Sequence, residues 1–244
     1  MEDIKTIRLD ETTSTNSFLR EYDGEEGRIM TVAVAKHQTA GRGQGTNTWE
    51  SEDGKNLLLS VLTRPDGVRA SQQYIMLEAC ALAVAATLRH YTDLITIKWP
   101  NDVYWKDLKI SGTLSECELR GSAIKRCITG TGININQTVF RCNAPNPVSL
   151  AQIIGHDVSL DKVLEEFISH YTKFYDMALK GRFDKIHAMY MQSLYRREGR
   201  FEFEDRSGRF TASIKTVEPD GHLMLQKADG NITKYAFKEV SFII

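Results

Sequence analysis

Residues 98–112 read KWPNDVYWKDLKISG, and this stretch decides the fold prediction because it joins the end of one strand to a turn and a hairpin. Residues 95–99, ITIKW, are predicted to form a strand. Pro100 fixes its own φ, and Asn101 and Asp102 are frequent turn residues, so a strand is predicted to stop here. Taken alone, this segment is more typical of a structural β-turn than of a binding site.

The hairpin after this turn brings chemically useful side chains within reach of one another. Residues 103–105 start its first strand, 106–107 form the bend, and the return strand carries Lys109. Lys109 lies one hairpin away from Asp102, so the two side chains can share a site. An isolated strand lysine is more often a solvated edge residue, and the hairpin alone does not choose between the two interpretations.

Outward from this hairpin, apolar patterns alternate between strand and helix. They predict strands over 5–9, 31–35, 56–63 and 124–136, and helices from Thr15, over 71–91, over 159–179 and over 183–194. Hairpins mixed with helices favour an α+β fold over a regular βαβ repeat.

The chain changes character after residue 194. Short alternating strands there are separated by RSGR, PDGH and ADGN, which are turn signals typical of a small antiparallel β-barrel. We therefore predict two domains, 1–192 and 193–244.

Composition excludes several classes of protein. The 244 residues carry a formal net charge of −1, which leaves no strong field for nucleic acid or an acidic membrane. The four cysteines are widely separated in sequence, the histidines show no metal-ligand spacing, and no apolar signal region is present. We expect a soluble cytoplasmic protein with reduced cysteines, no metal site built from a protein motif, and no nucleic-acid or membrane partner.

A glycine-rich loop, QTAGRGQGTNTWES at 38–51, follows the predicted strand over 31–35. Glycines permit backbone N–H groups to converge on an anion, and Arg42 can add a charged contact. The spacing matches neither a P-loop nor the dinucleotide fingerprint. By itself the loop is more typical of a flexible connection.

Two further polar groups stand out. In TGTGININ at 129–136, Asn134 and Asn136 alternate with isoleucines, so a continuous strand would place both on one face. They fit either a structural role or a polar pocket. STN at 14–16 fits either a helix cap or a site.

The order of these motifs resembles the biotin protein ligase family over nearly the whole chain. The resemblance rests on STN, AGRG followed by W-x-S, KWPND, K-I-x-G and G-x-G-I-N-x-N. It implies a central mixed β-sheet flanked by helices, related to class II aminoacyl-tRNA synthetases, with a carboxy-terminal barrel. It also implies an enzyme that uses ATP and Mg²⁺ to form biotinyl-5′-adenylate and then transfers biotin to a lysine of a biotin carboxyl carrier protein.

The resemblance assigns candidate site residues. The implied biotin contacts are Ser14, Thr15, Asn16, Gln38, Gly41, Arg42, Gly43, Gln44, Lys109 and Gly112. The implied ATP and adenylate contacts are Arg42, Trp49, Asn101, Lys109, Asn134 and Asn136. The candidate catalytic residues are Lys109, Arg42 and Asp102, with Asp102 expected to position or deprotonate the acceptor lysine. Mg²⁺ is expected to be held mainly by ATP.

One departure and several alternatives accompany this interpretation. Much of the family has an arginine where this chain has Gln44, so the loop carries one charge fewer. A lipoate-type ligase and a non-catalytic, biotin-sensing regulator are the alternative functions. Because 13 residues precede Ser14, too few for a helix-turn-helix domain, we expect the monofunctional type. A homodimer paired through a sheet edge is left open.

Overall fold

The computed structural model describes residues 4–22, 24, 29–141 and 146–244. Cys142, one of the four cysteines expected to be reduced, lies outside these ranges. The other three are free thiols. Cys117 and Cys127 are nonetheless neighbours, since they face each other on paired strands with their sulfurs 3.2 Å apart.

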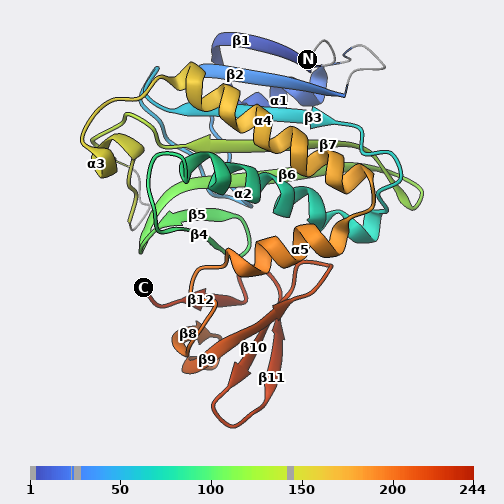
Figure 1. Ribbon diagram of the computed structural model, residues 1–244, viewed down its shortest axis with the longest axis vertical. Coiled ribbons are helices and arrows are strands. Elements are labelled where there is room, and N and C mark those ends of the chain that lie inside the picture. The colour runs from blue at the N-terminus through green and yellow to red at the C-terminus, as the bar shows by residue number, and fades with distance from the viewer. Residues whose placement is uncertain (1–3, 23, 25–28, 142–145) are drawn as a thin grey trace.

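A seven-stranded sheet in the order β1-β2-β3-β7-β6-β5-β4 forms the larger part of the molecule (Figure 1). Its strands are β1 (Ile4–Thr12), β2 (Met30–Gln38), β3 (Leu57–Thr63), β4 (Ile95–Lys98), β5 (Asp102–Trp105), β6 (Leu108–Arg120) and β7 (Ala123–Ile133). The β1–β2 pair is parallel and the other neighbours are antiparallel. The prediction of a central mixed sheet is therefore confirmed.

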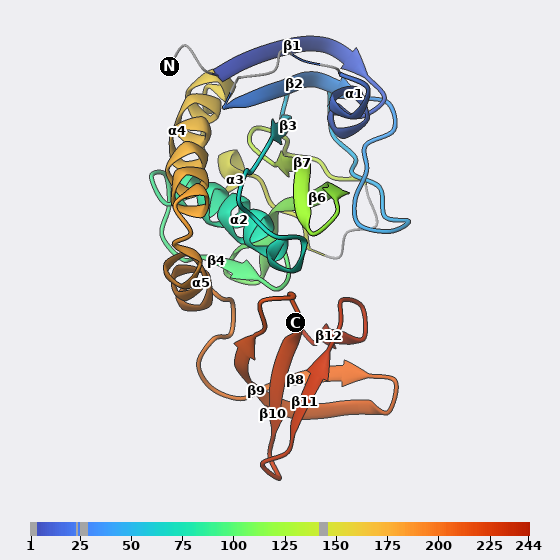
Figure 2. The ribbon, with the colours of Figure 1, turned by 90° about the vertical axis from the view of Figure 1, so that its right-hand side faces the viewer.

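Helices cover the sheet unequally. The helices are α1 (Thr15–Glu21), α2 (Tyr74–Leu88), α3 (Leu150–Ile154), α4 (Leu160–Leu179) and α5 (Phe183–Gln192), with a 3₁₀ turn η1 at Ala70–Gln72. Figure 2 shows α2, α4 and α5 on one side of the sheet, and α1 with the light-blue segment after β2 on the other. One face is thus closed by helices and the other is left for a site.

The helix predictions hold best where a cap or an apolar stripe defines the element. The hydroxyl of Ser159 accepts a hydrogen bond from the N–H of Lys162, and α4 runs from 160 to 179 as expected. The helix predicted over 71–91 is shorter, because η1 precedes it and α2 ends at Leu88. Almost all of α2 is buried, since it lies between the sheet and α4. Among the described helices, none is long and apolar enough to cross a membrane.

The carboxy-terminal part is a five-stranded antiparallel sheet in the order β11-β10-β9-β8-β12. Its strands are β8 (Phe201–Asp205), β9 (Gly208–Val217), β10 (Leu223–Lys227), β11 (Ile232–Tyr235) and β12 (Val240–Phe242). The antiparallel prediction is confirmed. Among the described strands of this small barrel-like sheet, the pairing runs from β11 at one edge to β12 at the other.

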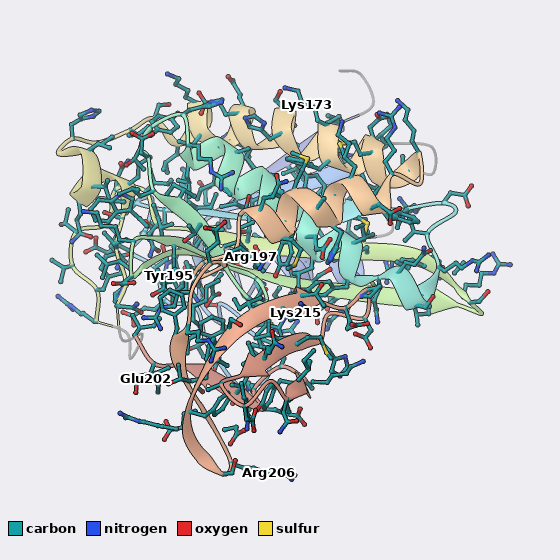
Figure 3. The ribbon with its side chains drawn as sticks, turned by 60° about the horizontal axis from the view of Figure 1, so that its bottom comes forward. Lys173, Tyr195, Arg197, Glu202, Arg206 and Lys215 are labelled. Carbon is teal, nitrogen blue, oxygen red and sulfur yellow. The ribbon has the colours of Figure 1, made fainter. Side chains whose placement is uncertain are left out.

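The two parts share one hydrophobic core. Trp99, at the end of β4, donates its indole N–H to the Gly221 carbonyl at 2.8 Å and lies 6.2 Å from the Phe237 ring centroid. Tyr195 lies at the junction of the helical layer and the small sheet, with its ring centroid 6.2 Å from that of Phe242 (Figure 3). The proposed division at 192–193 therefore crosses a packed interface, and it remains a prediction.

Candidate functional site

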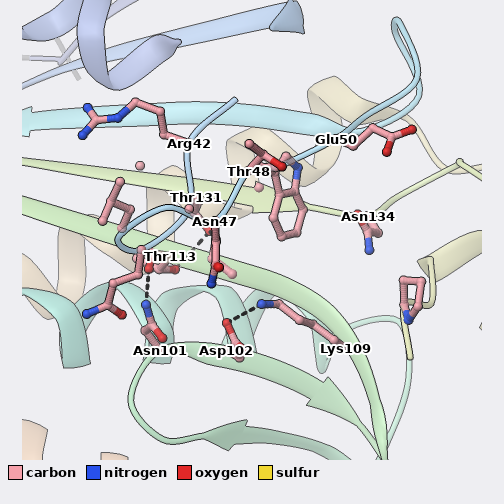
Figure 4. Close-up of a pocket in the computed structure, with 18 of the residues that line it drawn as sticks. Arg42, Asn47, Thr48, Glu50, Asn101, Asp102, Lys109, Thr113, Thr131 and Asn134 are labelled. Carbon is pink, nitrogen blue, oxygen red and sulfur yellow. Dashed lines mark hydrogen bonds and ion pairs between the residues drawn. The ribbon is translucent and has the colours of Figure 1, made fainter. Parts of the chain in front are cut away.

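A cavity of about 710 Å³ lies on the open face of the seven-stranded sheet. The segments that line it come from α1, the loop after β2, the turn between β4 and β5, the strands β6 and β7, and the small sheet. Of the predicted site residues, its walls include Ser14, Thr15, Asn16, Gln38, Arg42, Gly43, Gln44, Trp49, Asn101, Asp102, Lys109, Gly112 and Asn134. Figure 4 shows how the polar side chains from these separate segments surround one space.

The start of α1 forms one polar wall of the cavity. Ser14 is the N-cap residue of α1, yet its side chain makes no capping hydrogen bond. The backbone N–H of Thr15 donates to Gln38 Oε1 at 2.8 Å, which joins α1 to the end of β2. The hydroxyl of Ser14 is thus not needed to cap the helix, and it lies on the cavity wall.

Glu116 on β6 lies behind this wall and holds two of the side chains that line the cavity, Asn16 and Arg42. Its carboxylate accepts two hydrogen bonds from the Arg42 guanidinium, at 3.0 and 3.2 Å, and one from Asn16 Nδ2 at 2.9 Å. Arg20 Nη2 lies 2.5 Å from the same carboxylate. Burial opposes the ionisation of Glu116, but the bonds from Asn16 and Arg42 outweigh it and lower the pKa of the carboxyl.

The sequence predictions missed Glu116. It lies on the predicted return strand that carries Lys109, four residues beyond the end of the stretch 98–112, and nothing in the local pattern separates it from a solvated strand carboxylate. Its partners come from α1 and from the glycine loop, so only the tertiary structure assembles the group. Phe237 of the small sheet, which also lines the cavity, was missed for the same reason.

Lys109 and Asp102 meet as the hairpin prediction anticipated. Lys109 Nζ lies 2.7 Å from Asp102 Oδ1, and both side chains are about one quarter exposed or less, at 25% and 22%. Figure 4 shows Arg42 pointing away from this ion pair, so the structure does not bring the two predicted cations together. Lys98 also lines the cavity, and burial lowers the pKa of its ammonium group despite the nearby Asp102 carboxylate.

Trp49 forms an aromatic wall against two glycines of the sheet. A Cβ atom at Gly132 would lie 2.3 Å from Trp49 Cε2, and one at Gly112 would lie 3.2 Å from Trp49 Cζ3. The indole N–H of Trp49 is buried without a hydrogen-bond partner among the described residues. Lys109 Nζ lies 5.9 Å from the centre of the ring. The ring is therefore seated where only glycine permits it and keeps a donor for a ligand.

The asparagines divide into two groups. Asn101 and Asn134 line the cavity, and their side-chain amides donate to the backbone carbonyls of Thr113 and Val148. Asn136 does not line it. Asn136 Nδ2 donates to the Val158 carbonyl at 2.8 Å, and Asn136 Oδ1 accepts from the Val158 N–H at 2.9 Å.

The point at which strand β7 ends explains this difference. The strand predicted over 124–136 is three residues shorter at its end. Strand β7 ends at Ile133, so the expected alternation does not continue and Asn134 and Asn136 do not share a face. Gly41 also lies outside the cavity lining; it is buried, and its carbonyl accepts from the Trp49 N–H at 2.9 Å. Asn136 and Gly41 therefore hold the surroundings of the cavity in place.

The charges in the cavity are mostly paired. Arg42 and Lys109 each face a carboxylate. Within the described ranges, no three His, Cys, Asp or Glu side chains gather in a way that could hold a metal ion. The cavity therefore presents a hydrogen-bonding end near Gln38 and a charged end beside Lys109, with an aromatic wall at Trp49.

Comparisons with known proteins agree with this geometry. The chain is 27% identical over 235 residues to the bifunctional ligase/repressor BirA of Bacillus subtilis, covering 92% of this chain and 70% of that protein. It is 30% identical over 163 residues to the biotin–[acetyl-CoA-carboxylase] ligase of Paracoccus denitrificans, covering 64% and 67% of the two chains. The biotin protein ligase of Aquifex aeolicus, solved in complex with biotin and ATP, superposes with a TM-score of 0.79 at 25% identity and 97% coverage of each chain.

The family model supplies the remaining support. The model described as the Biotin/lipoate A/B protein ligase family matches residues 8–134, which include α1, the glycine loop, the turn after β4 and the hairpin that carries Lys109. The match covers most of the segments that meet at the cavity; Phe237 and the lining residues between 140 and 147 lie beyond it. The chain belongs to the Biotin/lipoate A/B protein ligase family.

Proposed function

We propose that this chain is an ATP-dependent biotin protein ligase, which activates biotin as biotinyl-5′-adenylate and transfers it to a lysine of a biotin carboxyl carrier protein. The observation that carries the proposal is the cavity in which a neutral hydrogen-bonding wall, the Lys109–Asp102 pair and the Trp49 ring meet. The hydrogen-bonding wall suits a neutral cyclic urea, and the Lys109–Asp102 pair suits an anionic acyl phosphate. The Trp49 ring suits a purine ring.

The first half-reaction needs positioning more than a protein nucleophile. An oxygen of the biotin carboxylate attacks the α-phosphorus of ATP, a new phosphorus–oxygen bond forms, and pyrophosphate leaves with the electron pair of the broken bond. The two reactants are both anionic. Lys109 offsets their repulsion, and its ion pair with Asp102 fixes the ammonium at the cavity wall before they bind.

Arg42 acts from the glycine loop. Its guanidinium is held by Glu116 in this structure, so contact with the adenylate phosphate requires a change of partner. Such an exchange fits a loop whose glycines let the backbone move when the ligand arrives. The ATP phosphates would hold Mg²⁺, which would supply neutralisation of their charge.

The second half-reaction transfers the acyl group to an amine. The acceptor lysine must lose a proton, because its ordinary pKa is about 10.4 and the ammonium has no lone pair. Asp102 takes this proton or orients the amine as it attacks the acyl carbon, and AMP leaves. Asp102 suits this role because it lies beside Lys109 on the cavity wall.

Biotin-dependent exchange of radiolabel between pyrophosphate and ATP tests the proposal. We expect exchange with biotin and none with lipoate or octanoate, and we expect Lys109→Ala to abolish it. Lys125→Ala serves as the control, because Lys125 is a surface lysine whose ammonium pairs with Glu118 outside the cavity. Exchange that follows lipoate instead of biotin would overturn the assignment of substrate.

A further inference from the structure

A chain of hydrogen bonds links Glu116 to the cavity wall through buried polar side chains. Asn16 Nδ2 donates to Glu116 at 2.9 Å, and the hydroxyl of Ser60 donates to Asn16 Oδ1 at 2.5 Å. The Ser60 and Thr15 hydroxyl oxygens are 2.7 Å apart. Ser60 is fully buried and Asn16 and Thr15 are each 3% exposed, so water does not replace these bonds.

Glu116 fixes the direction of this chain. An ionised carboxylate only accepts, so the Asn16 amide must donate with its nitrogen and accept with its oxygen. Ser60 has one hydroxyl hydrogen and gives it to Asn16, so the Ser60 oxygen is left to accept from the Thr15 hydroxyl. Every hydrogen in the chain therefore points toward Glu116.

The far end of the chain is left with an acceptor. The Thr15 hydroxyl is also within donating distance of Gln38 Oε1, at 3.1 Å, but this contact is longer than the 2.7 Å contact with Ser60, and Gln38 Oε1 already accepts the Thr15 N–H at 2.8 Å. With its hydrogen committed to Ser60, the Thr15 oxygen turns a lone pair to the cavity. Because Gln38 Oε1 is taken up by Thr15, the Nε2 group of Gln38 is left as the donor on the same wall.

We propose that Glu116 is a positioning residue that sets the donor and acceptor pattern of the cavity, so that Thr15 accepts a hydrogen bond from a ligand N–H. This inference rests on the proposed function, since the cyclic urea of biotin carries both the N–H groups and the carbonyl that such a wall complements. Glu116 acts through Asn16 and Ser60 and does not touch the ligand.

Two variants separate this role from the second contact of Glu116, the one with Arg42. In Glu116→Gln, the new amide can donate to Asn16, so the chain is free to reverse and the contact with Arg42 is weakened as well. In Ser60→Ala, the chain is cut in the middle while Glu116 keeps both Asn16 and Arg42. Only an effect shared by the two variants reports on the direction of the chain.

Calorimetric titration of each intact variant with biotin is the test. We expect both variants to bind biotin about tenfold more weakly, the loss associated with one hydrogen bond to the ligand. The variant that carries both Glu116→Gln and Ser60→Ala should lose no more biotin affinity than whichever single variant binds biotin more weakly, because both changes act on one chain of hydrogen bonds. Glu116→Asp keeps the carboxylate and should bind biotin more tightly than Glu116→Gln. Arg20→Met, which removes another partner of Glu116 and leaves the chain intact, should bind biotin as the unchanged protein does.

Each result supports or overturns the inference. Unchanged biotin affinity in Ser60→Ala overturns it, as does full additivity in the double variant. Circular dichroism of each variant before titration, together with binding by Glu116→Asp, excludes general misfolding as the cause. If the unchanged protein neither binds biotin nor catalyses exchange, the proposed function itself fails, which is a separate outcome.

Discussion

Single glycines decide whether the aromatic wall of the cavity can form. Gly132 and Gly112 lie opposite each other on β7 and β6, and the Trp49 ring occupies space that a side chain at either position would enter. A methyl group 2.3 Å from the ring carbon at Gly132 is far inside contact distance, whereas 3.2 Å at Gly112 requires only a small shift. The two sites therefore differ in how strongly they resist alanine.

We predict a graded effect on ATP binding from this difference. Gly132→Ala should displace Trp49 and raise the KM for ATP at least about tenfold, the equivalent of ~1.4 kcal/mol of binding free energy. Gly112→Ala should have a smaller effect, because the indole ring can yield by a few tenths of an ångström. Steady-state exchange kinetics at saturating biotin would measure both, and equal KM values for ATP in the two variants would contradict the prediction.

At the scale of elements, the contact between α2 and α5 contains a buried acid. Glu78 on α2 is fully buried, and His187 Nδ1 on α5 lies 2.8 Å from its Oε1. Burial raises the pKa of Glu78 even though His187 opposes this effect. The hydrogen bond that the His187 imidazole donates to the Glu78 carboxylate raises the pKa of His187 above its ordinary value of about 6.5.

The direction of these shifts predicts how stability depends on pH. A histidine whose pKa is raised by folding stabilises the fold fully below its unfolded pKa, and the contribution is lost as pH rises through the folded pKa. The raised pKa of Glu78 acts in the same direction. The difference in unfolding free energy between the unchanged protein and His187→Gln should therefore shrink as pH rises from about 6 to about 9.

Denaturant unfolding at several pH values would measure that difference. His156→Gln is a suitable control, because His156 is exposed and bonds only to the neighbouring Asp157 carbonyl among the described residues. The difference in unfolding free energy between His156→Gln and the unchanged protein should stay constant across this pH range. A His187→Gln difference that also stays constant across this range would show that the pair contributes no pH-dependent stability.

On the scale of the whole molecule, the small sheet is packed into the core of the larger part. Phe242 on β12 lies 4.9 Å from the Phe203 ring in an edge-to-face arrangement and also contacts the junction residue Tyr195. Phe237 and Trp99 form a second contact across the same boundary. Since the larger of the two clusters of buried apolar side chains spans both parts, we expect one cooperative unfolding transition.

Phe242→Ala tests this expectation. The truncation should lower the unfolding free energy by about 3 to 5 kcal/mol. All three tryptophans precede residue 193, and Trp99 also contacts the small sheet, so their fluorescence reports on the larger part and on its contact with the small sheet. The fluorescence and far-ultraviolet dichroism midpoints should move together. Ile244→Ala, at an exposed position of the same end, should change stability by no more than about 0.5 kcal/mol. A fluorescence midpoint unmoved by Phe242→Ala would indicate two independent domains.

The sequence by itself determined the elements whose signals are local. The turn after Trp99, the hairpin carrying Lys109, the cap at Ser159 and the alternating strands beyond residue 194 each follow from neighbouring residues. The order of the motifs also determined the family, since spacing along the chain carries that information.

Only the tertiary structure decided which polar groups meet. Glu116 gains its partners from α1 and the glycine loop, which are far from it in sequence, and no local period predicts that contact. The end of β7 at Ile133 separated Asn136 from the cavity, and the packing of Phe237 brought the small sheet to its wall. Local propensity acts over a few residues, whereas burial and hydrogen bonding act between whichever segments the fold brings together.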